Sequence, residues 1–504
     1  MKTKSFFFFF FLYTSNCFCQ NHYWGQQYGG PATLMGGTGV VGVSDNSAIY
    51  YNPGAIGFID STRITASTYI YGVEYIKLKN GAGTGLDLKS LRLNIFPQLI
   101  SASIPIRKVP KLKFIIGTFM RSRTNVSFSK ENEGNYEVIT GSPGLEYYKA
   151  RVEFSNNLFE QWLGFGLAYK INETYSVGFT SFGAYTHLEV RAFENMDADG
   201  VSNGVPYTTT VNEYNSMNLD QITQVFKLGF AARYKHVHLG LALTLPGIKI
   251  WGRGGLDKSF EVYNLNQNAV DTTVPAQKYQ SFVISDVQKG LQSHYVIPLS
   301  ASFGIELVYP KFKLAVSAEY FMGYKNKIIL QGADRAFIRP TATYADTITG
   351  FMTLRNSAKA IINFGLGAEI KIRPAVNLLL GARTDFNNRA EYLPGNTVLN
   401  VSSVKSPAWH YVFLSGGFTY KYASHTLTAG LDYGFGIPID DHQVFNITEP
   451  KQELYLKGNL NQNMKTSAHK LNFILSYVYF FKTKEKKDGM FSVIDALKKK
   501  RKKK

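Results

Sequence analysis

The sequence has little cysteine and no long apolar run beyond its beginning. Only two of its 504 residues are cysteines, Cys17 and Cys19. The remainder of the chain therefore offers no disulfide framework, no thiol nucleophile and no cysteine-based metal site. Hydrophobic residues make up 45% of the chain and the mean hydropathy is −0.12. A helical membrane protein is excluded, because a spanning helix needs a run of about 20 apolar residues.

Common enzyme motifs are also missing. The sequence contains no Gly-x-Ser-x-Gly motif and no His-Glu-x-x-His zinc motif. His236 and His238 share one face of a strand pattern, but without a third ligand they indicate a solvated turn rather than a metal site. We expect a protein that is not an enzyme and that holds no cofactor and no metal.

Alternation of apolar and polar residues dominates the rest of the chain. From Phe364 to Ile372, every second residue is apolar and those between are Gly, Glu or Lys. Successive side chains of a strand point to opposite faces, so one face meets an apolar medium and the other a polar one. The pattern predicts fourteen strands, at residues 62–76, 93–106, 111–128, 151–171, 174–192, 220–235, 236–252, 293–309, 311–328, 358–373, 375–390, 408–422, 424–438 and 467–481.

The connections between these stretches alternate between tight turns and long polar loops. The tight junctions are Arg107 to Pro110, Asn172 with Glu173, Lys235 with His236, Pro310, Arg373 with Pro374, and Ala423 with Ser424. Outer-membrane barrels have short periplasmic turns, long surface loops and an even number of strands, whereas a soluble β-sandwich does not segregate its loops in this way. We therefore predict an all-β fold, a 14-stranded antiparallel transmembrane β-barrel in a Gram-negative-type outer membrane, with periplasmic N- and C-termini.

Tyrosines lie close to the tight junctions. Tyr169, Tyr234, Tyr309 and Tyr422 are each within three residues of one. An amphipathic ring at such a position would lie at the level of the lipid headgroups. Tyrosine is common in strands in general, but the regular spacing favours an aromatic girdle.

The first 19 residues are typical of a secretory signal peptide. Lys2 and Lys4 precede an apolar core, and Cys17-Phe18-Cys19 provides a small-x-small cleavage site. A lipoprotein acylated at Cys17 or Cys19 is the alternative. The predicted organisation is a signal peptide at 1–19, a plug at 20–60, the barrel at 61–481 and a basic periplasmic tail at 482–504.

The segment before the first strand is rich in glycine. It contains Gly37-x-Gly39-x-x-Gly42, which has the spacing of a dinucleotide fingerprint. That fingerprint requires a βαβ unit, and here a barrel follows instead. A segment of small residues is expected to fold inside the barrel lumen, where glycines allow close packing and tight bends.

At these residues the chain resembles the FadL/TodX family of outer-membrane transporters for hydrophobic compounds. Met35-Gly36-Gly37-Thr38-Gly39 and Tyr51-Asn52-Pro53 match the family's N-terminal hatch motif, whereas Val41 to Val43 and Gly54-Ala55 depart from it. The candidate hatch residues are Met35, Gly36, Gly37, Gly39, Asn52 and Pro53.

The resemblance implies a barrel closed by this hatch, through which a hydrophobic small molecule, such as a long-chain fatty acid or a hydrocarbon, diffuses passively. It also implies a lateral exit made by an inward kink of the third strand, where Gly117 is the one candidate bend point. The sequence does not name the ligand contacts. Apolar loop residues are candidates, although packing among the loops explains them equally well: Phe260, Val262, Phe282, Val283, Phe337, Phe351 and Met352.

Charged residues fall on the inward face of several strands. We expect most of them to form salt bridges between neighbouring strands, with a role in selectivity or proton relay as the alternative. They are Lys227, Arg233, Glu306, Glu319, Glu369, Lys371, Arg383, Asp385 and Asp432.

The predicted function is thus an outer-membrane channel for passive uptake of hydrophobic small molecules. The expected partners are outer-membrane lipid, a hydrophobic ligand and the barrel-insertion machinery, and no nucleic acid. The alternatives are a FadL-like shuttle for protein export in the type IX secretion system, or a sealed surface scaffold. The basic tail, residues 482–504, is expected either to contact anionic lipid or the cell wall or to remain solvated.

Overall fold

The computed structural model describes most of the chain. It covers residues 15–16, 22–42, 45–106, 108–139, 142, 144–202, 204–265, 281–335, 337–341, 344–347, 350–390 and 408–481. The basic tail lies outside the described residues, and so does the predicted signal peptide apart from β1 (Ser15–Asn16).

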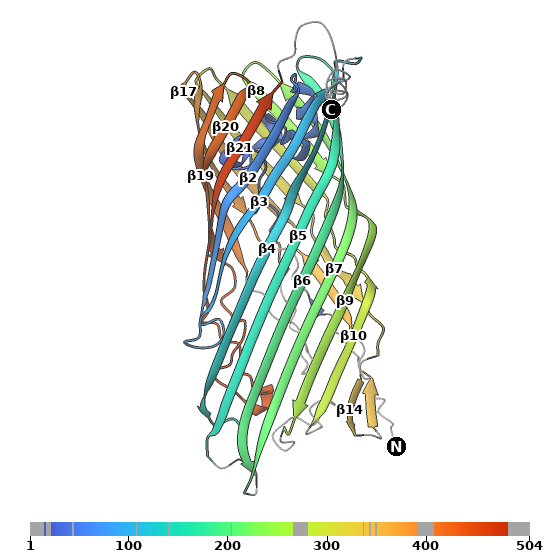
Figure 1. The fold of residues 1–504 in the computed structure, drawn as a ribbon, viewed down its shortest axis with the longest axis vertical. Helices are drawn as coiled ribbons and strands as arrows, with labels where there is room; N and C mark the ends of the chain where they lie inside the picture. Colours follow the sequence, from blue (N-terminus) through green and yellow to red (C-terminus); the bar gives the residue numbers. More distant parts are fainter. Residues whose placement is uncertain are drawn as a thin grey trace, which may run out of the picture.

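Fourteen strands form a closed ring. They are β2 (Arg63–Lys79), β3 (Leu88–Pro105), β4 (Leu112–Tyr136), β5 (Glu146–Lys170), β6 (Tyr175–Ser202), β7 (Val205–Arg233), β8 (Val237–Thr244), β11 (Ser300–Val308), β12 (Phe312–Phe321), β17 (Ile361–Arg373), β18 (Val376–Asp385), β19 (Trp409–Tyr422), β20 (His425–Pro438) and β21 (Lys465–Phe480). Each pairs antiparallel with its neighbours, and the β21–β2 and β7–β8 pairings complete the ring. The predicted 14-stranded barrel is confirmed (Figure 1).

Further strands lie at the end of the barrel that carries the long loops. After Pro246, β9 (Ile248–Tyr263) continues the path of β8 and pairs with β7 and with β10 (Phe282–Gln292). β13 (Tyr324–Gln331) and β16 (Thr353–Ala358) pair with each other, and β1 pairs with β16. β14 (Phe337–Thr341) and β15 (Tyr344–Thr347) form a hairpin.

The strands β4 to β7 are much longer than the sequence pattern predicts. They have 25 to 29 residues, whereas a strand crosses the bilayer core with about 9–11. On β5 the outward side chains are mostly apolar from Phe159 to Tyr169 and polar from Tyr147 to Asn157, while the inward face changes in the opposite sense. The predicted long-loop ends of these strands fell short of the observed ends, and on β5 the wall is apolar inside and polar outside from Tyr147 to Asn157.

The membrane-embedded part exposes a band of large apolar side chains. Leu163, Leu366 and Phe418 are 59%, 55% and 53% exposed on the outer surface. At the end with the tight turns, Tyr169, Tyr234, Tyr309 and Tyr422 are also exposed, as a girdle at headgroup level requires.

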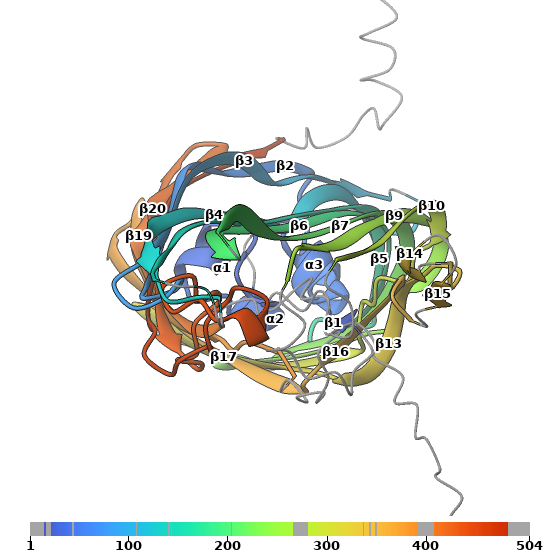
Figure 2. The same cartoon turned by 90° about the horizontal axis from the view of Figure 1, so that it is seen from below.

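The segment before β2 folds inside the ring. It contains α1 (Gly30–Leu34), α2 (Gly39–Gly42), α3 (Ala48–Tyr51) and the 3-10 helix η1 (Pro53–Phe58). α1 contacts β18 to β21, α2 contacts β8, β11 and β12, and η1 contacts β4 to β8. Since these strands lie on different sides of the barrel, the segment fills the lumen (Figure 2). No helix in the described part of the chain is long and apolar enough to cross a membrane.

Candidate functional site

The hatch, defined here as residues 22–59, is seated directly on glycines of the barrel wall. A Cβ added to Gly365 would lie 2.4 Å from the carbonyl oxygen of Gly36, and one added to Gly381 would lie 2.2 Å from the Gly36 nitrogen. Other wall glycines that touch hatch atoms in this way are Gly166, Gly178, Gly229, Gly240, Gly304, Gly367, Gly417 and Gly430. Because glycine has no side chain, the backbone and side chains of the hatch can approach the wall closely at these positions.

The candidate hatch residues come together in this contact. Gly36 and Gly37 have φ angles of 66° and 75°, which glycine adopts without strain, and they turn the chain after α1. The side chain of Asn52 donates to the carbonyl oxygens of Val40 at 2.8 Å and Phe230 at 2.9 Å, and accepts from the Gly54 nitrogen. Asn52 therefore joins two parts of the hatch to the wall.

Inward charges bind the hatch as well as one another. The indole nitrogen of Trp24 donates to Glu319 at 2.7 Å, and its backbone nitrogen donates to Asp385 at 2.9 Å. The ammonium of Lys227 donates to the carbonyl oxygen of Tyr50 at 2.6 Å. Salt bridges between neighbouring strands were expected for Glu319, Asp385 and Lys227, but these three wall residues hydrogen-bond to the hatch.

Other inward charges form salt bridges between wall strands. Glu306 lies 2.8 Å from His238, and Lys313 lies 2.7 Å from Glu369. Arg383 of β18 donates to both carboxylate oxygens of Asp432 on β20, at 2.6 and 2.9 Å, and both side chains are fully buried. The guanidinium carbon also lies 3.8 Å from the ring centre of Phe413 on the intervening strand. This pair fixes β18 to β20 behind the hatch.

The wall opens between β3 and β4. These two strands pair only from Leu99–Phe119 to Pro105–Lys113. Within the described residues, the remaining part of β3 forms a strand ladder only with β2 and the remaining part of β4 only with β5, although the Ser127 nitrogen of β4 donates to Ser90 Oγ of β3 at 3.4 Å. The separation begins inside the apolar band, because Arg123, beyond the last paired residue of β4, still lies opposite the outward Phe159. Beside it, Leu93 and Ile95 of β3 are each 71% exposed, so lipid tails can reach the opening.

Pro97 and Arg121 explain the separation. Pro97 has no backbone N–H to donate. It lies two residues before Leu99, where the pairing of β3 with β4 begins. On β4, the pairing with β5 shifts between Met120 and Ser122, so Arg121 forms a bulge, which bends a strand. At the expected bend point, Gly117, the pairing with both neighbours is regular. The bulge of this strand thus lies at Arg121, four residues beyond Gly117, and Pro97 was the overlooked sequence signal.

A cavity of about 90 Å³ lies beside this opening, on the long-loop side of the hatch. The hatch contributes His22 and Gln26, and β4 contributes the bulge and the residues that follow it. Aromatic rings face them from β19 and β5: Trp409, Tyr411, Phe413 and Phe154. The Arg121 side chain is 7% exposed and also lines a second cavity of about 30 Å³, with Lys227, Glu160 and Glu319. The larger cavity is therefore lined by aromatic rings on one side and by charged groups of the hatch and β4 on the other.

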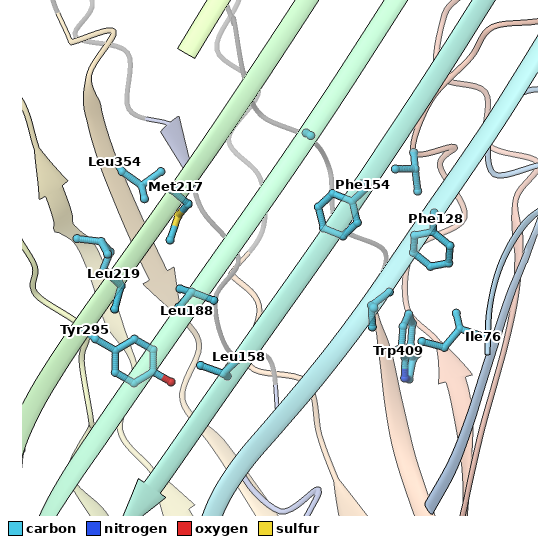
Figure 3. Close-up of a cluster of buried hydrophobic side chains, with 14 of the residues drawn as sticks. Ile76, Phe128, Phe154, Leu158, Leu188, Met217, Leu219, Tyr295, Leu354 and Trp409 are labelled. Atoms are coloured by element: carbon cyan, nitrogen blue, oxygen red, sulfur yellow. The ribbon is translucent and has the colours of Figure 1, made fainter. Parts of the chain in front are cut away.

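Buried apolar side chains continue from this cavity to the long-loop end. One cluster includes Tyr50 of the hatch, Phe119, Phe154, Leu188 and Met217. Figure 3 shows how such residues line neighbouring long strands. Phe260, Val262 and Phe282 belong to it but lie in β9 and β10, not in loops as expected; Phe351 and Met352 also belong, whereas Val283 is only half-buried. The side chain of Phe337 lies outside the described residues.

The loop between β20 and β21, residues 439–464, lies across part of the long-loop end of the barrel (Figure 2) and is called the mouth loop below. It contains the 3-10 helix η4 (Gln452–Leu454). Its contacts reach strands on several sides: Val444 N donates to Gly81 O at 3.0 Å, Tyr148 Oη donates to Leu456 O at 2.9 Å, and the Tyr455 ring lies 5.1 Å from that of Phe260.

Lys457 is the charged contact of this loop. Its ammonium lies 2.8 Å from Glu194 on β6 and 2.7 Å from Glu213 on β7. Burial alone would lower the pKa of Lys457, but the two carboxylates outweigh burial and raise it above its ordinary value. Lys457 therefore carries its charge at neutral pH and joins the mouth loop to β6 and β7.

Comparison with solved structures places this architecture. The chain is similar to a FadL homologue of Pseudomonas aeruginosa, with a TM-score of 0.54 and 15% identity over 93% of this chain and 100% of the other. It is similar to the P. putida toluene transporter TodX, with a TM-score of 0.51 and 12% identity over 91% and 100%. The Ralstonia pickettii toluene transporter TbuX gives 0.50 and 11% over 91% and 99%.

No protein-family model and no curated protein matches this sequence. The structural likeness establishes an outer-membrane-type β-barrel with the fold of the FadL and TodX channels. The resemblance that the hatch motif indicated is confirmed at this level.

Proposed function

We propose that this protein is an outer-membrane channel for the passive uptake of hydrophobic small molecules. The observation that carries the proposal is a buried apolar cluster that runs from the mouth loop, along the long strands β4 to β7, to the hatch. Apolar surface of this kind transfers a hydrophobic solute without exposing it to water. The similar structures are named as a FadL homologue and as toluene transporters.

The solute would enter at the long-loop end and move along the apolar cluster to the cavity of about 90 Å³ beside the hatch. It would then leave between β3 and β4. Leaving sideways delivers it into lipid, so it never has to cross a water-filled pore. This direction requires the tight turns and both chain ends to lie in the periplasm, as short periplasmic turns and long surface loops predict. The hatch would close the straight route through the lumen.

Uptake into cells that lack a route of their own tests the proposal. Expression of the chain in a Gram-negative host without endogenous long-chain fatty acid or aromatic hydrocarbon uptake should restore accumulation of one of these labelled solutes. Accumulation of a hydrophilic sugar should not rise, because the hatch fills the lumen. Equal rates for both solute classes, or none for either, would reject hydrophobic uptake. Binding of secreted protein domains without solute uptake would support the export alternative.

A further inference from the structure

The tight-turn end of the barrel carries a ring of positive charge. The short-turn rim is defined as Lys108, Lys111, Lys235, Lys311, Arg373 and Lys421, all with exposed side chains. In the part of the chain that the structure describes, none of them forms an ion pair with an acidic side chain. Two other lysines at this end are neutralised: Lys170 lies 2.6 Å from Glu173, and Lys113 lies 3.1 Å from Asp60.

At the opposite end of the barrel, several cations have acidic partners. There Arg151 lies between Glu131 and Glu153, and Arg191 contacts Glu189. Lys77 lies 3.0 Å from Asp87. These cations are paired within the protein, whereas the exposed Lys149, Lys289, Lys325, Lys327 and Lys451 of the same end form no ion pair in the part of the chain that the structure describes. The unpaired charge of the short-turn rim is free for an external anion.

The rim also lies at a defined depth in the membrane. Tyr234, Tyr309 and Tyr422 are 47%, 43% and 66% exposed and lie next to or near rim cations in the sequence. Tyrosine rings of such a girdle mark the headgroup region. Lysine and arginine side chains of neighbouring turns extend from apolar surroundings toward phosphate groups at this level.

The rim cations are distributed around the perimeter. They come from the β3–β4, β7–β8, β11–β12, β17–β18 and β19–β20 turns, which lie on different sides of the ring. A protein partner docks on one arc of a surface, whereas a lipid leaflet surrounds all of it. We propose that the short-turn rim binds the phosphate groups of anionic glycerophospholipids in the leaflet around it. The proposal uses the transmembrane barrel but does not depend on transport.

Competition between two lipids tests the proposal. The full-length protein in detergent is given equal amounts of phosphatidylglycerol and phosphatidylcholine, and bound lipids are counted by native mass spectrometry. Phosphatidylglycerol should exceed phosphatidylcholine about fivefold or more, and the excess should fall as salt is added. In the variant with Lys108, Lys235, Lys311, Arg373 and Lys421 each replaced by Gln, the ratio should approach one.

A matched variant removes the same amount of charge from the long-loop end. It replaces the exposed Lys149, Lys289, Lys325, Lys327 and Lys451 by Gln, and it should keep the preference of the unmodified protein. Heat-modifiable gel migration confirms that both variants are folded. The proposal is overturned if the unmodified protein shows no preference or if the matched variant also loses it. It is equally overturned if soluble glycerophosphoglycerol displaces the lipid, because the rim would then bind a free phosphodiester.

Discussion

The carbonyl oxygen of Gly36 occupies the place that a side chain at Gly365 would need. A Cβ at Gly365 would lie 2.4 Å from this oxygen, and the nearest other wall atom in its way is the Ser317 hydroxyl at 3.1 Å. The hatch is thus held by backbone-to-wall contact as well as by hydrogen bonds. This seating makes the fit of the hatch sensitive to any side chain added beneath it.

Gly365→Val should displace the hatch while leaving the barrel folded. Valine suits a strand, so the wall itself tolerates the change, but its side chain must push Gly36 away. We expect a leak of hydrophilic solutes, measured as raised conductance in planar bilayers. Gly416→Val is the matched control, since the closest atom to an added Cβ is there the flexible end of Leu380 at 3.5 Å. Unchanged conductance in Gly365→Val would show that the hatch is not seated by this contact.

Arg383→Met should destabilise the barrel because it leaves Asp432 as an unpaired buried charge. Removal of one partner of a buried ion pair costs about 3–5 kcal/mol. Reversible urea unfolding in detergent micelles measures the loss. In Arg383→Met combined with Asp432→Leu neither charge of the pair remains, and much of the stability should return. If the double variant were less stable than the single one, the desolvation argument would be wrong.

Much of the barrel was predictable from period-two alternation and loop lengths. Tight turns such as Lys235 with His236 were placed correctly, because a short hairpin connection needs no tertiary information. The ends of the long strands were not. On β5 the apolar residues change from the outward to the inward face near Phe159; the predicted strand continued past this point to residue 151, whereas β5 itself begins at Glu146.

The candidate site was only partly predictable. The hatch motif located Gly36 and Asn52, since glycine and proline patterns are local. Their partners, such as Gly365 and Phe230, come from distant strands and depend on barrel register. The bulge at Arg121 carries no distinctive composition, because a bulge is set by the pairing of two strands. Pro97, in contrast, was a visible irregularity inside a predicted strand.

Closing the opening between β3 and β4 should stop hydrophobic uptake. Pro97→Val restores a backbone donor to β3, and deletion of Arg121 removes the bulge from β4. With both changes the two strands should pair beyond Leu99, and uptake of a labelled hydrophobic solute should fall to the level of empty cells. Pro206→Val, at an exposed end of β7, is the control and should leave uptake unchanged. Undiminished uptake in a folded double variant would require a different exit.

Lys457→Met should loosen the mouth loop. Without the ammonium, Glu194 and Glu213 are left as neighbouring carboxylates. An unpaired buried charge costs about 3–5 kcal/mol, so the loop should open roughly 150- to 5,000-fold more often. Hydrogen exchange of the amides of Val444 and Ile447, which donate to Gly81 and Ala82, measures opening. Lys451→Met, at an exposed lysine of the same loop, should exchange like the unmodified protein.

The pH dependence of the same exchange follows from the pKa of Lys457, which the two carboxylates raise above its ordinary value. A raised pKa in the folded state means that the stabilisation is complete below the unfolded value of about 10.4 and is lost only as the pH rises through the folded value. After correction for the intrinsic effect of pH on exchange, protection should therefore stay constant from neutral pH to about pH 9. A loss of protection within that range, seen also in Lys457→Met, would assign it to another group.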